Sequence, residues 1–420
     1  MTVESIFLIL GGILFIGYFG ELLSKKFALP TALLLLLIGY GIKMTGFVNA
    51  NDFVDLQELF GSLALIVLLF DGGMCLNIFD VIFKSGRVLI IGIAITLIAM
   101  ASAAALFMIM GFDPLIGAII GAVAGGIGSS TTISIVKSLA LPKKIQDFLT
   151  IESSITDIFS IIFTIVLTQT LISGIINFQT IFQGIIGKFA VGLFIGLALG
   201  LTAILLLARI QKGYNYMITF ATVILLYSAT EFLNGSGAIA VLAFGIILGN
   251  EMPIRKTFKI KLADGSLQIK QFQNEISFFI RTFFFVFLGI VVTLGNMQNL
   301  LIAVILMVML YIIRYFVINF CTLNTEFAEH TKILSAINPR GLATAVLATY
   351  PLIVVQNSLA ENSSQSLLNL LPQLTSLSEI AFYLIILSLA FTTILVPLAS
   401  AKKQEEPAKK KNRLNTGKIL

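Results

Sequence analysis

The chain of 420 residues is 58% hydrophobic and only 11% charged, with a formal net charge of +6. Soluble proteins carry about 25% charged residues, and a single hydrophobic core stops growing at about 250–300 residues, so this composition excludes a soluble protein. Its apolar stretches, about 18–25 residues long, favour membrane-spanning helices over the strands of about 10 residues in β-barrels. The basic residues lie in small groups between these stretches rather than on a sustained basic face, so we expect no nucleic-acid partner.

In chain order, the apolar stretches predict thirteen transmembrane helices. They cover approximately residues 5–23, 30–46, 56–77, 87–110, 114–136, 146–172, 180–209, 215–232, 236–250, 274–294, 298–320, 330–355 and 378–400. The predicted fold is an all-α polytopic membrane protein with a single transmembrane domain over residues 1–400. We divide it into a first repeat over about 5–172, a linker helix over 180–209 and a second repeat over about 215–400, followed by a short basic cytoplasmic tail over 401–420.

The Lys and Arg residues predict the orientation of these helices in the membrane. In this layout, 22 of the 27 Lys and Arg residues lie in the links and the tail of one side. Cytoplasmic loops of membrane proteins carry the excess of Lys and Arg. We therefore expect a multi-pass protein of the plasma membrane with its N-terminus outside and its C-terminus in the cytoplasm.

Two links predict further structure. The residues on either side of Asp264-Gly265 alternate between apolar and polar, which is typical of a β-hairpin. We expect a small cytoplasmic hairpin there, between residues 258 and 272. The link over 356–378 is rich in Ser, Asn and Gln and is expected to be a long outer loop.

Short motifs recur between the two halves of the chain. Leu29-Pro-Thr-Ala-Leu and Ile38-Gly-Tyr-Gly41 resemble Ser236-Gly-Ala-Ile-Ala and the glycines that follow it. Leu69-Phe-Asp-Gly-Gly73 similarly resembles Val286-Phe-Leu-Gly289. Matching helices are seven apart, an odd offset, so the pattern predicts two six-helix repeats with opposite orientations in the membrane.

Charged residues inside the predicted helices mark candidate functional sites, because each costs about 2.5–3.5 kcal/mol at the bilayer centre. Seven such residues occur: Asp71, Glu152, Asp157, Glu231, Arg281, Arg314 and Arg340. For Arg281 and Glu231, a side chain that reaches the membrane surface is an equally good explanation. Asp157 differs from these two, since the following run of residues from 158 to 187 contains no charge.

The segment Ile151-Glu-Ser-Ser-Ile-Thr-Asp157 is the strongest candidate for the site. On a helix, Ser153 and Asp157 lie one turn apart on one face, and Glu152 and Thr156 form a second such pair. A carboxylate with a hydroxyl one turn away supplies hard oxygen ligands for a small cation. Because burial disfavours an unpaired charge, a proton can compete with the cation for Asp157.

Two predicted helices contain residues that interrupt a helix. Gly125-Gly-Ile-Gly-Ser-Ser-Thr-Thr132 combines three glycines with four hydroxyls, which fits either close helix packing or an unwound ion site. Asn338-Pro-Arg-Gly341 interrupts the helix at the repeat-equivalent position, since proline removes a backbone hydrogen bond. Two interruptions at matching positions favour discontinuous crossing helices around an ion.

In combination and in this order, these motifs resemble the sodium/proton exchanger family of monovalent cation:proton antiporters over nearly the whole chain. The resemblance rests on Glu152-Ser153-x-x-Thr156-Asp157, Ser129-Ser-Thr-Thr132, Phe284-Phe-Val-Phe-Leu-Gly289, Ser236-Gly-Ala-Ile-Ala240 and Pro339-Arg-Gly341. It implies an antiporter that works by alternating access, with a transported cation and proton, no bound cofactor, and a homodimer in the lipid bilayer.

The resemblance also implies roles for individual residues. Asp157 corresponds to the carboxylate that binds cation and proton alternately, and the implied cation ligands are Asp157, Ser153, Thr156, Ser130, Thr131, Thr132 and, as a weaker match, Asp71. Glu152 corresponds to an acid paired with a buried arginine, for which Arg314 is the first choice and Arg340 the second. Such a pair would stabilise the fold, because an unpaired buried charge is costly.

Residue 156 is Thr where electrogenic relatives carry a second Asp, so one-for-one, electroneutral exchange is expected. Na⁺ is the first expected cation, with K⁺ and Li⁺ as alternatives, since Ser130-Thr-Thr132 resembles the potassium-efflux branch. Two other functions stay open: a channel-like efflux pathway without proton movement, and an organic-anion symporter in which Arg314 and Arg340 contact the substrate. Two cysteines and a single histidine, His330, lack the spacing of a zinc or haem site, so no enzyme of those classes is expected.

Overall fold

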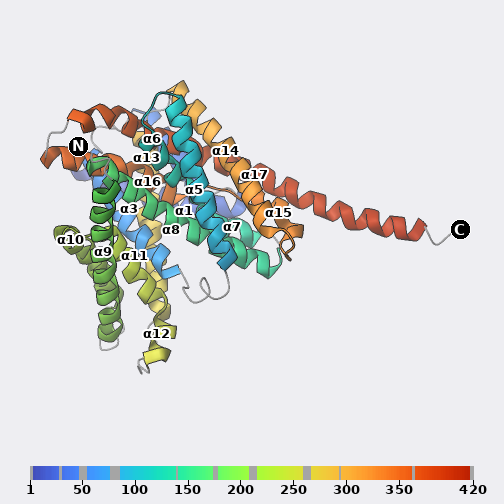
Figure 1. Ribbon diagram of the computed structural model, residues 1–420, viewed down its shortest axis with the longest axis horizontal. Coiled ribbons are helices and arrows are strands. Elements are labelled where there is room, and N and C mark those ends of the chain that lie inside the picture. The colour runs from blue at the N-terminus through green and yellow to red at the C-terminus, as the bar shows by residue number, and fades with distance from the viewer. Residues whose placement is uncertain are drawn as a thin grey trace.

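The computed structural model describes residues 3–27, 31–46, 54–75, 86–138, 141–173, 178–207, 215–258, 266–292, 295–361 and 365–416. Nearly all of these residues are helical, and no strand occurs among them. The helices pack side by side into one bundle, and the C-terminal part of the last helix projects away from it (Figure 1).

The helical segments follow the thirteen predicted spans in order. Eleven spans are single helices: α1 (Val3–Phe27), α2 (Thr31–Met44), α3 (Val54–Cys75), α5 (Gly86–Ile109), α8 (Lys143–Ser173), α9 (Phe178–Leu207), α10 (Asn215–Phe232), α11 (Gly237–Gly249), α13 (Ser266–Val291), α14 (Met297–Thr322) and α17 (Gln365–Thr416). The fifth and twelfth spans are each broken in two, as α6 (Pro114–Gly125) with α7 (Ser129–Ser138) and α15 (Thr331–Ala336) with α16 (Leu342–Glu361). The short helices α12 (Glu251–Phe258) and η2 (Ala328–His330) lie in links. The predicted all-α architecture is confirmed.

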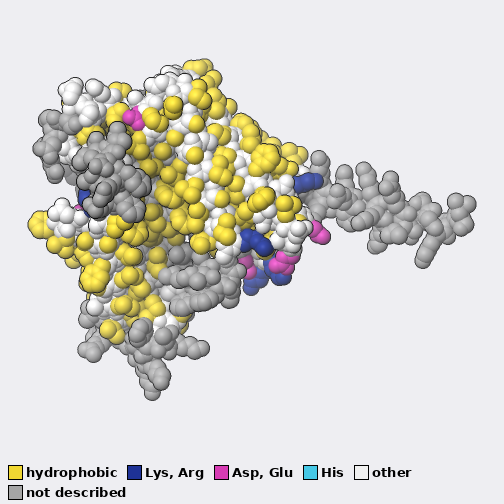
Figure 2. All heavy atoms as spheres, in the orientation of Figure 1, with side chains coloured by type: hydrophobic (Ala, Val, Ile, Leu, Met, Phe, Trp, Pro, Cys, Tyr) yellow, Lys and Arg dark blue, Asp and Glu magenta, His cyan; other side chains and the backbone are white. Residues whose placement is uncertain are grey.

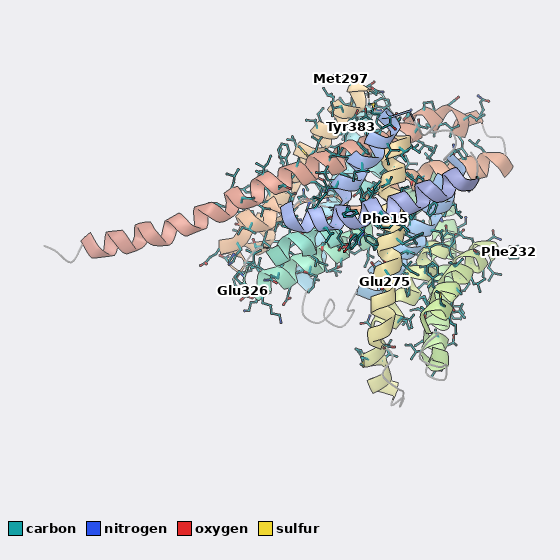
Figure 3. The ribbon with its side chains drawn as sticks, turned by 180° about the vertical axis from the view of Figure 1, so that it is seen from behind. Phe15, Phe232, Glu275, Met297, Glu326 and Tyr383 are labelled. Atoms are coloured by element: carbon teal, nitrogen blue, oxygen red, sulfur yellow. The ribbon has the colours of Figure 1, made fainter. Side chains whose placement is uncertain are left out.

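The surface of the bundle suits a lipid environment. Six described helices have at least 18 residues and are apolar enough to cross a membrane, and six shorter apolar segments of 10–17 residues accompany them. Figure 2 shows a face covered mostly by hydrophobic side chains, with charged side chains gathered at the end where α15 lies. Met297, the first residue of α14, and Glu326, which follows that helix, lie at opposite ends of the bundle (Figure 3). α14 therefore runs from one end of the bundle to the other.

The predicted β-hairpin is wrong. Residues 266–272 form the first turns of α13, and residues 259–265 lie outside the described part of the chain. The apolar–polar alternation there covers too few residues to outweigh the long helix that continues from it. The predicted outer loop over 356–378 is also wrong, because α16 continues to Glu361 and α17 begins at Gln365. The predicted tail is helical as far as Thr416, as a continuation of α17.

The glycines of the repeated motifs pack against one another. A Cβ on Gly39 of α2 would lie 3.1 Å from the Cα of Gly289 of α13, and nearer still to the carbonyl oxygen of Val286. A Cβ on Gly245 of α11 would lie 3.3 Å from the Cα of Gly73 of α3. Each crossing joins a helix of one repeat to a helix of the other, so the same contact is made twice. Glycine permits this close approach of two backbones, which explains why the motif recurs.

The two discontinuous helices are confirmed at the predicted positions. Pro114 occupies the first turn of α6, and Asp113 caps that helix by accepting a hydrogen bond from the Leu115 N–H at 2.7 Å. α6 ends at Gly125, and residues 126–128 separate it from α7. Residues 337–341 separate α15 from α16 in the same way. Both interruptions leave backbone groups without helical partners inside the bundle.

Candidate ion-binding site

Helix α8 carries a group of neighbouring polar side chains into the interior of the bundle. Glu152, Ser153 and Thr156 are fully buried, and Asp157 is 8% exposed. These side chains are protected from lipid because α8 packs against α5, α6, α7 and α16. A charge at this depth requires compensation from protein groups, which come from the two broken helices and from α14.

The break between α6 and α7 is held by two side chains of α8. The Ile127 N–H donates a hydrogen bond to the Thr156 hydroxyl at 3.2 Å, and the Ser129 N–H donates to Asp157 Oδ2 at 3.1 Å. Ser129 is the first residue of α7, so the Asp157 carboxylate lies at the positive end of that helix. A helix N-terminus stabilises a negative charge through its free N–H groups and its dipole.

The two broken helices touch each other at their interruptions. The Gly128 N–H donates a hydrogen bond to the Pro339 carbonyl oxygen at 2.9 Å. A Cβ on Gly128 would lie 2.9 Å from the Cα of Gly341, and a Cβ on Gly341 would lie 3.1 Å from the Cα of Gly128. Side chains at either position would force the two interruptions apart, so both glycines are required for the crossing.

Arg340 compensates the other end of the break. This residue is 1% exposed, and its Nη1 donates hydrogen bonds to the carbonyl oxygens of Gly125 and Gly126 at the end of α6. Those carbonyls are the negative end of α6, so a guanidinium there is stabilising. Arg340 also acts electrostatically on Asp157. At the break, the Asp157 carboxylate thus lies at the positive N-terminus of α7, and the Arg340 guanidinium lies at the negative C-terminus of α6.

In the second interruption, as in the first, a backbone N–H donates a hydrogen bond to a hydroxyl on a neighbouring helix. The Arg340 N–H donates a hydrogen bond to the Ser388 hydroxyl of α17 at 3.0 Å, as the Ile127 N–H does to Thr156 of α8. α8 and α17 are the last helices of the two repeats. Ser388 was not predicted from the sequence, although the seven-helix offset between the repeats points to a hydroxyl on α17.

Glu152 pairs with Arg314, the first of its two candidate partners. Arg314 Nη1 lies 2.6 Å from Glu152 Oε1, and Nη2 lies 3.0 Å from Oε2. Arg314 Nε and Nη2 also donate to the Leu334 carbonyl oxygen at 3.0 and 2.7 Å. The two side chains are 1% and 0% exposed. The ion pair joins α8 to α14, and the bonds to the Leu334 carbonyl join α14 to α15.

Asp157 keeps one oxygen without a partner. Asp157 Oδ1 and the hydroxyl of Ser160, one turn further along α8, accept and donate no hydrogen bond among the described residues. A Cβ on Gly126 would lie 3.0 Å from Asp157 Oδ1 and 2.8 Å from Ser160 Oγ, so the two oxygens flank the same point of the unwound backbone. Buried oxygens usually have partners. Ser160 was missed in the sequence, although its spacing from Asp157 places it on the same helix face.

The hydroxyls of α7 belong to its first turn. Thr131 and Thr132 are buried, and the Thr132 hydroxyl has no hydrogen-bond partner among the described residues. The Thr131 hydroxyl would lie 3.7 Å from a Cβ on Gly341, which places it beside the second interruption. Ser130 lies in the same turn, and its side chain is outside the described residues.

The hydroxyls of Thr156 and Ser153 make hydrogen bonds within the protein, and Asp71 lies against a different helix. The Thr156 hydroxyl donates to the Ser153 carbonyl oxygen at 3.1 Å besides accepting from the Ile127 N–H, and the Ser153 hydroxyl donates to the Thr150 carbonyl oxygen at 3.0 Å. Asp71 accepts a hydrogen bond from Ser277 of α13 at 3.5 Å. No described hydrogen bond or charge interaction joins Asp71 to Asp157. The structure therefore does not bring Asp71 into the site, because α3 holds it against α13.

Comparison with known proteins identifies the family. Residues 11–401 match the family model described as the transmembrane region of sodium/hydrogen exchangers. The chain belongs to the sodium/hydrogen exchanger family. The matched range contains both broken helices, Asp157 and the Glu152–Arg314 pair. This is a family of cation/proton antiporters rather than a class of enzymes.

Curated relatives in this family resemble the chain at low identity. The K⁺/H⁺ antiporter NhaP of Alkalimonas amylolytica is 24% identical over 356 residues, which are 82% of this chain and 60% of the relative. The K⁺/H⁺ antiporter NhaP2 of Shewanella sp. (strain ANA-3) is 23% identical over 280 residues, 64% of this chain and 48% of the relative. The chain thus spans less than two thirds of the length of either relative.

Solved structures show the same fold. The sodium proton antiporter MjNhaP1 from Methanocaldococcus jannaschii, solved at pH 8, matches with a TM-score of 0.78 at 20% identity, over 95% of this chain and 99% of that chain. An electron-microscopy structure of the same antiporter matches with a TM-score of 0.76, over 96% and 98% of the two chains. The likeness extends over nearly all helices of the bundle and confirms the antiporter fold.

Proposed function

We propose that this protein is a secondary active antiporter that exchanges a monovalent cation, Na⁺ or K⁺, for a proton at a single carboxylate, Asp157. The cation and the proton occupy the same carboxylate in turn. The crossing helices move relative to the rest of the bundle and open Asp157 to one side of the membrane and then to the other. The transported ions are substrates, and no resident cofactor takes part in the proposed cycle.

The environment of Asp157 gives the main support for this proposal. One carboxylate oxygen is held by the Ser129 N–H, while the other, beside the Ser160 hydroxyl, has no hydrogen-bond partner in the described part of the chain. A buried carboxylate at a helix N-terminus is tolerated as an anion, and its charge is neutralised by either a cation or a proton. Free oxygens of the carboxylate and hydroxyl type are suitable ligands for a hard cation.

The number of unpaired charges supports one-for-one exchange. Glu152 is bound to Arg314, so Asp157 is the carboxylate at the crossing that is available for an incoming cation. Among the described residues, no group of three or more His, Cys, Asp or Glu side chains lies together as a metal site. A single available negative charge favours a monovalent cation and an electroneutral exchange with one proton.

The positions of the arginines argue against organic-anion transport. The Arg314 guanidinium is occupied by Glu152 and the Leu334 carbonyl, and the Arg340 guanidinium by the end of α6. Neither is available to bind a substrate carboxylate in this arrangement. A channel-like pathway, in which the cation crosses without a proton, is the alternative that transport measurements separate from antiport.

We also propose the orientation predicted from the basic residues. α8 then begins in the cytoplasm, where the exposed side chains of Lys144 and Glu326 form an ion pair at 2.6 Å, and ends at the outer face. The N-terminus lies outside and the C-terminus in the cytoplasm. The plasma-membrane location and the homodimer stay predictions.

Proteoliposomes test the proposed exchange directly. With Na⁺ or K⁺ inside the vesicles and choline outside, we expect cation efflux to draw protons inward and to acidify the lumen. Because the exchange is electroneutral, an imposed membrane potential should leave the initial rate of acidification unchanged. Cation efflux without acidification would support the channel-like alternative, and absence of both fluxes with either cation would refute the proposal.

A further inference from the structure

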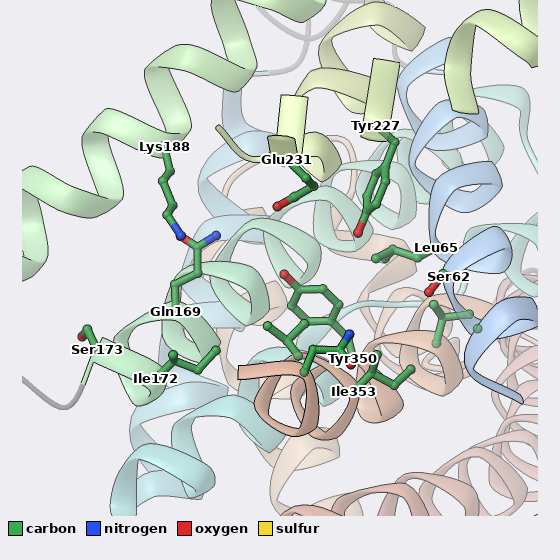
Figure 4. A pocket seen from close by; sticks show the side chains of 14 residues that line it. Ser62, Leu65, Gln169, Ile172, Ser173, Lys188, Tyr227, Glu231, Tyr350 and Ile353 are labelled. Atoms are coloured by element: carbon green, nitrogen blue, oxygen red, sulfur yellow. The ribbon is translucent and has the colours of Figure 1, made fainter. Parts of the chain in front are cut away.

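A cavity of about 510 Å³ lies between α3, α8, α9, α10 and α16 (Figure 4). Gln169 of α8 and Tyr350 of α16 line one wall, and Lys188 of α9 with Tyr227 and Glu231 of α10 line the other. Gln169 is twelve residues beyond Asp157, a distance of about 18 Å along the helix axis. The cavity is therefore on the side at which α8 ends, the outer side in the proposed orientation.

Three oxygen-bearing groups are directed into the same part of the cavity. Figure 4 shows the Glu231 carboxylate together with the hydroxyls of Tyr227 and Tyr350. All three residues line the cavity. Glu231 Oε1 accepts a hydrogen bond from the Gly237 N–H at 2.7 Å, and the second carboxylate oxygen has no hydrogen-bond partner among the described residues. Carboxylate and hydroxyl oxygens are suitable ligands for a hard monovalent cation.

Lys188 supplies the opposing charge. It acts electrostatically on Glu231, and Figure 4 shows its ammonium group directed toward Gln169. The Lys188 carbonyl oxygen accepts a hydrogen bond from the Ser236 N–H at 3.0 Å, which fixes α9 beside the start of α11. A lysine in this position competes with a cation for the negative charge of Glu231. The cavity thus contains an acid, a competing base and two phenolic hydroxyls.

We propose that this cavity is a vestibule with a low-affinity site for the transported cation, formed by Glu231, Tyr227 and Tyr350 and weakened by Lys188. The inference rests on the proposed exchange function and places this site in series with Asp157. A charged cleft with low-dielectric walls raises the local concentration of counter-ions. Glu231 therefore increases the rate at which cations enter from this side, and Lys188 limits how tightly they are retained.

The test compares exchange driven from each side of oriented proteoliposomes. Glu231→Gln keeps an oxygen for the Gly237 N–H and removes the charge. We expect it to raise the apparent KM for Na⁺ or K⁺ on the cavity side about three- to tenfold, with kcat and the KM on the opposite side unchanged. Lys188→Gln is expected to lower the cavity-side KM about threefold, because it removes the competing charge.

Asp113→Asn is the matched control. Asp113 caps α6 through the Leu115 N–H at the same outer end, and Asn is an equally good cap. This variant also removes one negative charge, but from outside the cavity, so the cavity-side KM should not change. Equal shifts in Glu231→Gln and Asp113→Asn, or an equal shift on both sides of the membrane in Glu231→Gln, would overturn the proposal.

A binding measurement separates this inference from the exchange function. The chain contains nine tyrosines and no tryptophan, so its ultraviolet emission comes from tyrosine. Replacing choline chloride by NaCl or KCl at constant ionic strength is expected to change this emission in the wild type and in Asp157→Asn, but not in Glu231→Gln. If the wild type moves no protons, the exchange proposal fails, but the change in emission still shows whether the cavity binds the cation. A change in emission in Glu231→Gln as large as that in the wild type would refute the proposed cation site.

Discussion

Asp157→Asn is expected to reduce cation-dependent proton movement to the level of empty vesicles. The amide oxygen of Asn can still accept the hydrogen bond that Ser129 N–H donates to Asp157 Oδ2 at 3.1 Å. The substitution therefore preserves the support of α7 and removes the charge that cation and proton share. Initial rates of acidification, measured at equal amounts of reconstituted protein with Na⁺ and with K⁺, check this expectation.

The control for this experiment is Asp113→Asn, the same chemical change at a helix cap. It should retain wild-type rates, since Asp113 is distant in the chain from α8 and caps α6 at its outer end. Both variants should elute from size-exclusion chromatography as the wild type does. Substantial exchange by Asp157→Asn would show that another group carries the proton and that Asp157 is not the group shared by cation and proton.

Glu152→Gln is expected to destabilise the folded protein by about 3–5 kcal/mol, because it leaves the Arg314 guanidinium charged and buried without its counter-ion. The pair is bidentate, with distances of 2.6 and 3.0 Å, and both side chains are almost inaccessible to solvent. The Leu334 carbonyl oxygen remains as a neutral acceptor and cannot replace the lost charge. The apparent melting temperature in detergent, followed by tyrosine emission or by loss of the monodisperse peak, should fall markedly.

Ser153→Ala is the matched control on the same turn of α8. The Ser153 hydroxyl donates only to the Thr150 carbonyl oxygen of its own helix, so its loss should cost much less than the loss of Glu152. In addition, Arg314→Met combined with Glu152→Gln should recover part of the lost stability, since no unpaired charge remains. A larger loss of stability in Ser153→Ala than in Glu152→Gln would contradict the assignment of Glu152 and Arg314 as a stabilising pair.

The positions of the helices and of the two interruptions could be predicted because both depend on local chemistry. Apolar runs of sufficient length must span the membrane as helices, and prolines and glycines such as Pro339 and Gly128 cannot continue one easily. The resemblance to the exchanger family implied a buried arginine partner for Glu152, with Arg314 as the first choice and Arg340 as the second, and the structure shows the contact with Arg314. The recurrence of the glycine motifs was visible in the sequence, whereas the contacts of Gly39 with Gly289 and of Gly73 with Gly245 are known from the structure.

The remaining features depend on three-dimensional arrangement. The third-span acid Asp71 has the charge expected of an ion ligand, but the packing of α3 against α13 gives it Ser277 and Arg281 as neighbours. Thr156 has the spacing of a ligand and is used to hold the break between α6 and α7. The role of Glu231 depends on a cavity formed by five helices, which no local pattern reveals.

Sharing of Asp157 by cation and proton is tested by the dependence of cation affinity on pH. If cation and proton compete for Asp157, lowering the pH on the cation-loading side must raise the apparent KM for Na⁺ or K⁺, while the maximal rate at saturating cation stays constant. The increase in KM should be proportional to proton concentration once Asp157 is mainly protonated. Initial rates over a matrix of pH and cation concentration give this result in one experiment. An apparent KM that is independent of pH, with only the maximal rate changing, would show that cation and proton occupy different groups.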